Sequence, residues 1–368
     1  MTSVLTTAAL CPPGPPQAGW VAIDDDVIVE VASGDPPAGA LDLGASLLAP
    51  GFVDMQVNGV GDVDFASADG EAWRRAGRAQ LEQGVTAYCP TLVTAPLDDY
   101  SPALARVRAA RLDREGQPLP AILGVHLEGP FLGGAPGAHP VGLLRSVDSE
   151  WLRRTLDAYP DLVTLVTLAP EADPDFAGTR LLCTRGVRVA LGHSTATYEH
   201  ALAAVDAGAR LVTHLFNGMG ALHHREPGLV GAALDDDRLT PTLIADLVHV
   251  HPAVLRLAID RKPNLALVTD RVAVPGMRVT DDGAARLPDG TLAGSTLSMD
   301  AAVRNAVGLG TTVERAIEMA TTIPSTALGL ADRGRIVPGA RADLVALDPG
   351  SLAVRAVWLA GDLAYESA

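Results

Sequence analysis

The sequence predicts a (β/α)8 barrel with a small β-sandwich domain built from both ends of the chain. Eight short apolar runs lie between residues 52 and 270, and stretches of helical periodicity separate several of them. Most runs are rich in Val, Leu and Ile without strict alternation, as expected for parallel strands that are buried on both faces. The 368 residues, 48% of them hydrophobic, suffice for a barrel and an accessory domain.

The expected barrel strands are residues 52–57, 86–92, 121–127, 163–169, 187–193, 210–216, 242–249 and 265–270. Helical patterns between them cover residues 69–84, 147–159 and 195–208. Asp69 stands where it can cap the first helix, and Gly84 and Gly208 stand where helices commonly end. Eight such units would close a barrel whose catalytic mouth lies at the carboxyl ends of the strands.

The two ends of the chain carry a different pattern. Residues 1–50 contain the hairpin-like stretch GWVAIDDDVIVEVASG, and residues 334–368 read as short strands punctuated by Gly, Pro and Asp. We expect both ends to pair into one small β domain beside a barrel of residues 51–333. A further hairpin is expected near residues 275–294, inserted after the eighth strand.

Charge and cysteine content exclude several classes of protein. The net charge of −16 and the pI of about 4.9 argue against binding to nucleic acid or to an anionic membrane. Cys11, Cys89 and Cys183 are far apart and odd in number, which favours reduced thiols in the cytoplasm over a disulfide framework. We expect neither a signal peptide nor a membrane-spanning stretch.

The basic residues and motifs exclude several reaction types. The single lysine, Lys262, lies in the polar turn DRKPN, where a solvated side chain is expected. Schiff-base chemistry, a Walker P-loop and a carbamylated-lysine metal bridge each need a lysine inside a site, so none is expected. The sequence has no GxSxG or GxGxxG motif. Ser194 directly follows His193, and sequence neighbours rarely face each other as nucleophile and base.

Polar residues finish most of the later strands, at the end where active sites of this fold lie. They are His126, Glu128, His193, His214, Asn217, Asp246, His249, His251 and Asp270. Glu128, His193 and His214 together match a metal site of one carboxylate and two imidazoles with open positions for water. Zn²⁺ suits such ligands, and Fe²⁺, Co²⁺ or Mn²⁺ can also occupy them. Asp270 would act as the acid and base of the hydrolysis.

The first expected strand carries Gln56 and Asn58 where many metal-dependent hydrolases have a His-x-His pair. The missing pair indicates loss of a second metal and not of the whole site. One divalent ion per subunit is therefore expected. Gln56 would hydrogen-bond the water or a ligand, and Asn58 would shape the turn after the strand.

A series of motifs resembles the N-acetylglucosamine-6-phosphate deacetylases of the amidohydrolase superfamily. They are PGFVDMQVNG, GVHLEGPFL, LGHSTAT, THLFNGM, REPGLVGAAL, IADLVHV, LVTD, LAGSTLSMDAAVRN and GRIVPGARADLVALD. HLEGPF, and HLFNGM followed by REPGL, are specific to that family. The resemblance covers nearly the whole chain and implies hydrolysis of N-acetylglucosamine 6-phosphate to glucosamine 6-phosphate and acetate.

The resemblance also implies residue roles. Glu128, His193 and His214 match the metal ligands, and Asp270 matches the catalytic acid/base. The matching substrate contacts are His139, Asn217, Gly218, Arg225 and His249. Arg225 matches an arginine that reaches the phosphate in the neighbouring subunit, which implies a homodimer. Arg225, His249 and the metal would provide local positive charge for a phosphosugar.

Two departures from the family pattern leave the substrate open. Arg271 follows Asp270 where a small residue is usual, and His223 and His224 form an unusual pair that we expect to be solvated or at an interface. The galactosamine isomer is an alternative substrate. A catalytically inactive sugar-phosphate binding protein on the same fold is a second alternative. A cyclic amidase is not favoured, because many use the His-x-His pair and a bridging lysine.

Overall fold

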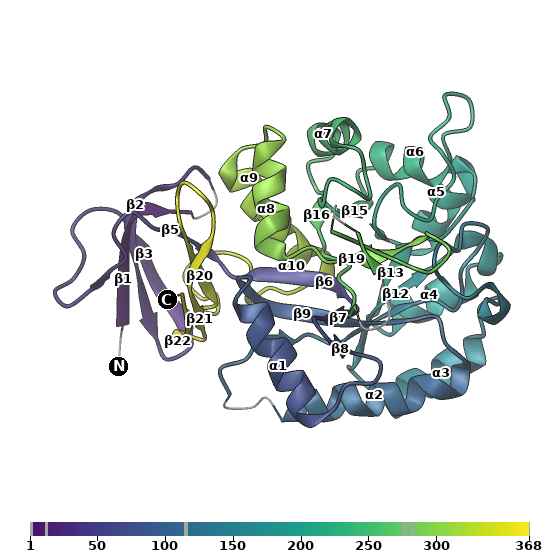
Figure 1. Ribbon diagram of the computed structural model, residues 1–368, viewed down its shortest axis with the longest axis horizontal. Coiled ribbons are helices and arrows are strands. Elements are labelled where there is room, and N and C mark those ends of the chain that lie inside the picture. Colours follow the sequence, from purple (N-terminus) through teal and green to yellow (C-terminus); the bar gives the residue numbers. More distant parts are fainter. Residues whose placement is uncertain (1–2, 12–13, 114–116, 275–277, 281–282, 368) are drawn as a thin grey trace.

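The computed structural model describes residues 3–367 except 12–13, 114–116, 275–277 and 281–282. Figure 1 shows a barrel surrounded by helices and, to one side, a separate sheet in which strands from both ends of the chain lie together. The barrel carries the site discussed below.

The barrel strands lie in the sheet in the order in which they follow along the chain. They are β6 (Phe52–Val57), β9 (Val85–Val93), β11 (Val125–Glu128), β12 (Val163–Leu168), β13 (Arg188–Leu191), β14 (Leu211–Val212), β15 (Thr240–Leu243) and β16 (Ala266–Leu267). The short strand β10 (Ala121–Ile122) also pairs with β9. Past β16, the Asp270 amide donates to the Gln56 carbonyl at 2.9 Å and connects the last strand to the first. The predicted eight-stranded parallel barrel is confirmed.

Several apolar runs extend beyond the strands that they form. Residues 192–193, 213–216, 244–249 and 268–270 leave the sheet as loops, although we predicted them as strand. The reason is local geometry: the chain turns at these points to continue into the next helix or insertion. These loops carry most of the polar residues that we predicted for the site.

Helices connect the strands on the outside of the barrel. They are α1 (Gly70–Leu81), α2 (Leu97–Leu112), α3 (Ser149–Ala158), α4 (Ala177–Thr184), α5 (Tyr198–Ala207), α6 (Gly228–Asp235), α7 (Pro252–Arg261), α8 (Met299–Gly308), α9 (Val313–Ala320) and α10 (Thr322–Leu328). The three predicted helices correspond to α1, α3 and α5. Asp69 stands at the N-cap of α1, but its side chain accepts no hydrogen bond there, so the predicted cap is wrong. Gly84 and Gly208 follow α1 and α5 with positive φ, as predicted.

Strands from both chain ends form one sheet with its own apolar core. They are β1 (Ser3–Leu10), β2 (Gln17–Asp24), β3 (Val27–Ala32), β4 (Leu41–Asp42), β5 (Leu47–Pro50), β20 (Leu344–Leu347), β21 (Val354–Leu359) and β22 (Asp362–Glu366). Antiparallel pairing of β5 with β20 joins the two ends, with Ala49 opposite Val345. The β region shared by both ends is confirmed, while the domain boundaries stay a prediction.

The predicted insertion after the eighth strand forms an antiparallel sheet of β17 (Arg278–Val279), β18 (Ala284–Arg286) and β19 (Leu292–Ser295). The first residues of the predicted hairpin, 275–277, lie outside the described residues, as do 281–282. A second, smaller hairpin of β7 (Gly59–Val60) and β8 (Val63–Asp64) follows β6. Both insertions follow carboxyl ends of barrel strands, which places them at the mouth.

Lys262 is buried, with 0% of its side chain exposed, so the prediction of a solvated lysine is wrong. Its Nζ donates to the Asp236 carbonyl at 2.6 Å, and burial lowers its pKa. Both residues precede barrel strands, so they lie at the end of the barrel opposite the mouth. Lysine chemistry is therefore still excluded from the mouth, but by position and not by solvation.

Among the described residues, no helix combines the length and apolar character needed to cross a membrane. Cys11, Cys89 and Cys183 are free thiols, as expected.

Candidate active site

A cavity of about 640 Å³ opens at the carboxyl ends of the barrel strands. Its volume lies in the range of roughly 300–1,000 Å³ typical of small-molecule sites. Loops after most barrel strands and the inserted sheet line it. Its titratable lining residues are Asp64, Glu128, His139, His193, His214, His249, Asp270 and Arg286.

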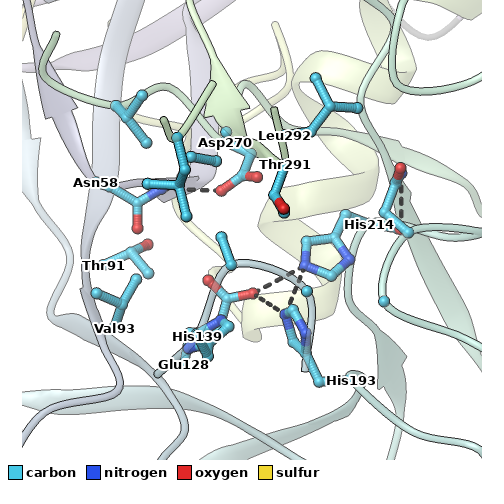
Figure 2. Close-up of a pocket in the computed structure, with 18 of the residues that line it drawn as sticks. Asn58, Thr91, Val93, Glu128, His139, His193, His214, Asp270, Thr291 and Leu292 are labelled. Atoms are coloured by element: carbon cyan, nitrogen blue, oxygen red, sulfur yellow. Dashed lines mark hydrogen bonds and ion pairs between the residues drawn. The ribbon is translucent and has the colours of Figure 1, made fainter. Parts of the chain in front are cut away.

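Three of the predicted residues meet at the floor of this cavity. The Nε2 atoms of His193 and His214 lie 3.0 and 2.9 Å from the same oxygen, Oε1 of Glu128, and 3.1 Å from each other. Figure 2 shows the two rings and the carboxylate pointing at one another. All three side chains are buried. The structure thus brings together the three residues that we predicted as metal ligands, although they come from different strands.

The backbone turns sharply at the residues that point into the cavity. His193, His214 and Asp270 have φ values of +49°, +32° and +47°. Residues other than glycine avoid this left-handed region, at a cost of order 1 kcal/mol or more each. The surrounding packing holds these conformations, and each one aims a side chain at the mouth.

The hydrogen bonds of His193 determine which nitrogen faces the cluster. Its Nδ1 lies 3.2 Å from the carbonyl oxygen of Ala135, which can only accept, so Nδ1 carries the hydrogen of the neutral ring. Nε2 then presents a lone pair to Glu128 and His214. Glu128 Oε1 and the Nε2 atoms of both histidines thus lie within about 3 Å of one another, an arrangement that needs a shared proton or a cation to stabilise it.

The charges of the cluster support the same conclusion. Burial opposes ionisation of Glu128, but contacts with His193 and His214 hold its pKa well below its ordinary value. Burial alone would lower the pKa of His214, yet Glu128 raises it above the ordinary value. The protein alone therefore needs a proton to hold the cluster together, and a divalent cation can replace it. The residues fit a metal that accepts nitrogen and oxygen ligands.

His139 lies beside the metal-fitting cluster. Its ring centroid is 4.4 Å from that of His193, and potential ligand atoms of Glu128, His139 and His193 lie within 4.8 Å of one another. This spacing is looser than the 2.9–3.1 Å among Glu128, His193 and His214, and Nδ1 of His139 contacts Thr94 Oγ1 at 2.8 Å. Burial lowers the pKa of His139 to about 3, so the ring is neutral. The tighter trio of Glu128, His193 and His214 therefore fits a metal better than the group that includes His139.

Asp270 faces the cluster with one oxygen fully engaged. Its Oδ1 accepts from Asn58 Nδ2 at 2.9 Å and from Gln56 Nε2 at 3.1 Å, while Gln56 Nε2 also donates to Glu128 Oε2 at 3.1 Å. In the described part of the chain no donor contacts Oδ2. Burial raises the pKa of Asp270 to about 6, and the charge of Glu128 adds to the rise. Figure 2 shows the contact between Asp270 and Asn58, a role for Asn58 that the sequence did not predict.

Four of the predicted substrate contacts line the cavity: His139, Asn217, Gly218 and His249. Gly218 has a φ of +58°, and an added Cβ would lie 2.7 Å from His193 Nδ1, so a side chain does not fit there. Nδ1 of His249 donates to Asp246 Oδ2 at 2.6 Å, which fixes the ring at the cavity wall.

Arg225 does not line the cavity. It lies on an exposed loop, where its Nη1 donates to His224 Nε2 at 2.8 Å. The rings of His223 and His224 are also exposed, with centroids 4.3 Å apart. As expected, this histidine pair is not part of the metal-fitting cluster.

Three other residues that the sequence analysis named do not line the cavity. His126 is buried between the hydroxyls of Thr91 and Thr167, at 3.1 and 2.7 Å, and burial lowers its pKa to about 4. His251 accepts from an amide at the start of α7. Arg271 is partly buried and does not line the cavity, and burial lowers its pKa.

The sequence did not point to several residues around the site. Arg286, in the inserted sheet, is the one arginine among the described lining residues, and Thr291 and Leu292 project into the same space (Figure 2). Buried Asp54 accepts a hydrogen bond of 2.6 Å from the hydroxyl of Thr269, the residue that directly precedes Asp270. Burial raises the pKa of Asp54 to about 7. Asp54 lies in the first-strand motif, two residues before Gln56, which is a signal that could have identified it.

The chain is similar to known proteins along most of its length. The profile of the amidohydrolase family matches residues 47–364. An N-acetylgalactosamine-6-phosphate deacetylase of Escherichia coli O157:H7 is 40% identical, over 95% of this chain and 96% of that protein. An N-acetylglucosamine-6-phosphate deacetylase of Mus musculus is also 40% identical, over 89% of this chain and 85% of that one.

A solved structure is similar over nearly the full length. It is an alanine mutant of the N-acetyl-D-glucosamine-6-phosphate deacetylase of Mycobacterium smegmatis in complex with N-acetyl-D-glucosamine 6-phosphate. The TM-score is 0.91 at 37% identity, and the match covers 99% of both chains.

Proposed function

The chain belongs to the amidohydrolase family, among the N-acetylhexosamine-6-phosphate deacetylases, and from this we propose that it deacetylates N-acetylglucosamine 6-phosphate. The products are glucosamine 6-phosphate and acetate, so the enzyme is an amide hydrolase of amino sugar catabolism. The observation that carries the proposal is the meeting of Glu128, His193 and His214 opposite Asp270 in one cavity.

We propose that Glu128, His193 and His214 bind one divalent ion per subunit, and their nitrogen and oxygen ligand atoms suit Zn²⁺. When bound, such an ion lowers the pKa of water and polarises a carbonyl. Fe²⁺, Co²⁺ and Mn²⁺ accept the same ligands. Gln56, between Glu128 and Asp270, takes the space where a first-strand ligand of a second ion would stand.

Asp270 acts first as a base and then as an acid. Its Oδ2 takes a proton as water attacks the acetyl carbonyl, and it returns the proton to the nitrogen as the C–N bond breaks. Hydrogen bonds from Asn58 and Gln56 to Oδ1 keep Oδ2 turned toward the substrate. Neutral His139, held by Thr94, supports the oxygen of the attacked carbonyl.

The sugar phosphate is recognised by Asn217, Gly218 and His249 on the cavity wall and by Arg225 of a second copy in a homodimer. The exposed position of Arg225, outside its own cavity, supports this arrangement. Binding of the phosphate needs a positively charged side chain nearby, because the chain as a whole carries a net charge of −16. We further propose that the enzyme acts in the cytoplasm.

The identity of the sugar is tested by kinetics on both isomers. We expect kcat/KM for N-acetylglucosamine 6-phosphate to exceed that for the galactosamine isomer at least about tenfold. A hydroxyl of the wrong configuration leaves a buried polar group unpaired, which costs about 1–3 kcal/mol. The measurement is acetate release with each sugar phosphate under the same conditions. A higher kcat/KM for N-acetylgalactosamine 6-phosphate would favour that sugar as the substrate. The similarity to the N-acetylgalactosamine-6-phosphate deacetylase of E. coli is the observation in favour of this alternative.

A complementation experiment tests the shared site. Arg225→Gln alone is expected to lower kcat/KM about 10- to 100-fold, since a charge-assisted hydrogen bond contributes about 1.5–3 kcal/mol. Coexpression of Arg225→Gln with Asp270→Asn is then expected to restore about a quarter of the wild-type activity, because roughly half of randomly paired dimers are mixed and hold one intact site. If Arg225 served its own subunit, mixed dimers would have no intact site and no activity would return.

A catalytically inactive binding protein is not favoured. Such a protein has no need to retain an acid/base opposite a metal-fitting cluster, and this chain retains both.

A further inference from the structure

Glu171 connects the two loops that carry His139 and His193. It lies in η2 (Pro170–Ala172), directly after β12. Its Oε2 accepts from Ser194 Oγ at 2.6 Å, and its Oε1 accepts from the amides of Thr195 at 2.8 Å and Gly134 at 3.1 Å. Glu171 is not among the residues that line the cavity. One carboxylate therefore holds the loop after β11 against the loop after β13.

The loop from Gly133 to His139 lies against His193. The Gly133 amide donates to the His193 carbonyl at 2.9 Å, and the Ala135 carbonyl accepts from His193 Nδ1 at 3.2 Å. The position of this loop thus determines which ring nitrogen of His193 carries the hydrogen and where the other one points.

The loop packs so closely against Glu171 and Thr195 that two of its positions, Gly133 and Gly134, have no room for a side chain. A Cβ on Gly133 would lie 2.1 Å from Glu171 Oε1, and a Cβ on Gly134 would lie 2.4 Å from Thr195 Oγ1. Although burial opposes its ionisation, hydrogen bonds from Ser194 and Thr195 hold the pKa of Glu171 below its ordinary value. At neutral pH the carboxylate is therefore ionised and acts only as an acceptor.

We propose that Glu171 is a positioning residue that keeps His193 in the tautomer and orientation needed to bind the metal. The inference rests on the proposed function only through the assignment of His193 as a ligand. It also gives Ser194 a role: its hydroxyl donates to Glu171, so the serine next to the ligand supports the metal site without acting as a nucleophile.

The test is Glu171→Gln, measured by metal affinity. The amide keeps the size of the side chain but removes its charge. Its N–H₂ group can face only Ser194, whose hydroxyl must then accept, and the two amides donate to a neutral oxygen, so the charge-assisted hydrogen bonds are weakened. We expect the affinity for Zn²⁺ or Co²⁺, measured by competition with a chromophoric chelator, to fall about tenfold. This is the lower end of the range of about 10- to 100-fold for direct partners of a metal-bound histidine, because Glu171 acts through the loop that contacts His193. The absorption spectrum of the Co²⁺ form should also change.

Glu150→Gln is the matched control, because the Glu150 carboxylate lies on the surface of α3, paired with Arg154 at 3.0 Å. It is expected to leave metal affinity unchanged. Gly133→Ala is the second variant: its new Cβ displaces the Glu171 carboxylate without removing the charge, and metal affinity should fall in the same direction.

The thermal unfolding midpoint of each variant checks that it folds. Folded Glu171→Gln and Gly133→Ala proteins that bind Zn²⁺ as tightly as the Glu150→Gln control would overturn the inference. The proposed function fails separately: if the metal-loaded wild type releases no acetate from either sugar phosphate, the affinity comparison still decides the role of Glu171.

Discussion

Replacement of Asp270 by asparagine is expected to lower kcat about 10²- to 10⁴-fold, the usual contribution of a positioned acid/base. Asparagine keeps the shape of the side chain and an oxygen that can accept from Asn58 and Gln56. It cannot take a proton from water or return one to the leaving nitrogen. The loss should therefore appear in kcat with little change in KM.

Metal content separates this role from a structural one. Asp270 is not one of the three proposed ligands, so elemental analysis of Asp270→Asn should show the wild-type metal content. Asp206→Asn, on the surface in an ion pair with Arg238, is the control and should keep wild-type kinetics. Normal turnover by metal-loaded Asp270→Asn would remove Asp270 from the mechanism.

Removal of the metal is expected to lower acetate release roughly a thousandfold or more, because Lewis-acid catalysis contributes several kcal/mol. The experiment is dialysis of the purified enzyme against a chelator, followed by an acetate-release assay with elemental analysis of the same sample. Adding back about one equivalent of Zn²⁺ per subunit should restore activity, since three protein ligands hold one ion.

Two results would contradict this prediction. Undiminished acetate release from a sample shown to be metal-free would reject metal dependence. Two tightly held ions per active site would reject the one-ion assignment, which depends on Gln56 and Asn58 in place of a first-strand His-x-His pair.

The fold and the reactive residues were accessible from the sequence for a local reason. Apolar runs buried on both faces identify parallel strands, and the residue that ends such a strand lies at the mouth whatever the loops do. Glu128, His193, His214 and Asp270 all stand at such ends. The motif resemblance added residue roles that spacing alone does not provide.

The contacts between segments distant in sequence needed the tertiary structure. Asn58 reaches Asp270 across 212 residues, and Glu171 reaches Thr195 across 24. Lys262 reads as a turn lysine, yet the chain before β15 covers it. Each of these contacts depends on which loops are neighbours in the folded protein, and hydrophobic periodicity does not predict that.

The barrel, the pairing of the chain ends and the types of residue at the strand ends are therefore readable from the sequence, because each follows from a local pattern. The approach of Glu128, His193 and His214 to within about 3 Å of one another is a property of the folded chain. The contacts of Asn58 and Gln56 with Asp270 and the position of Arg225 outside the cavity are likewise visible only in the folded chain. Such geometry depends on side chains converging from separate strands, and three-dimensional packing alone creates that convergence.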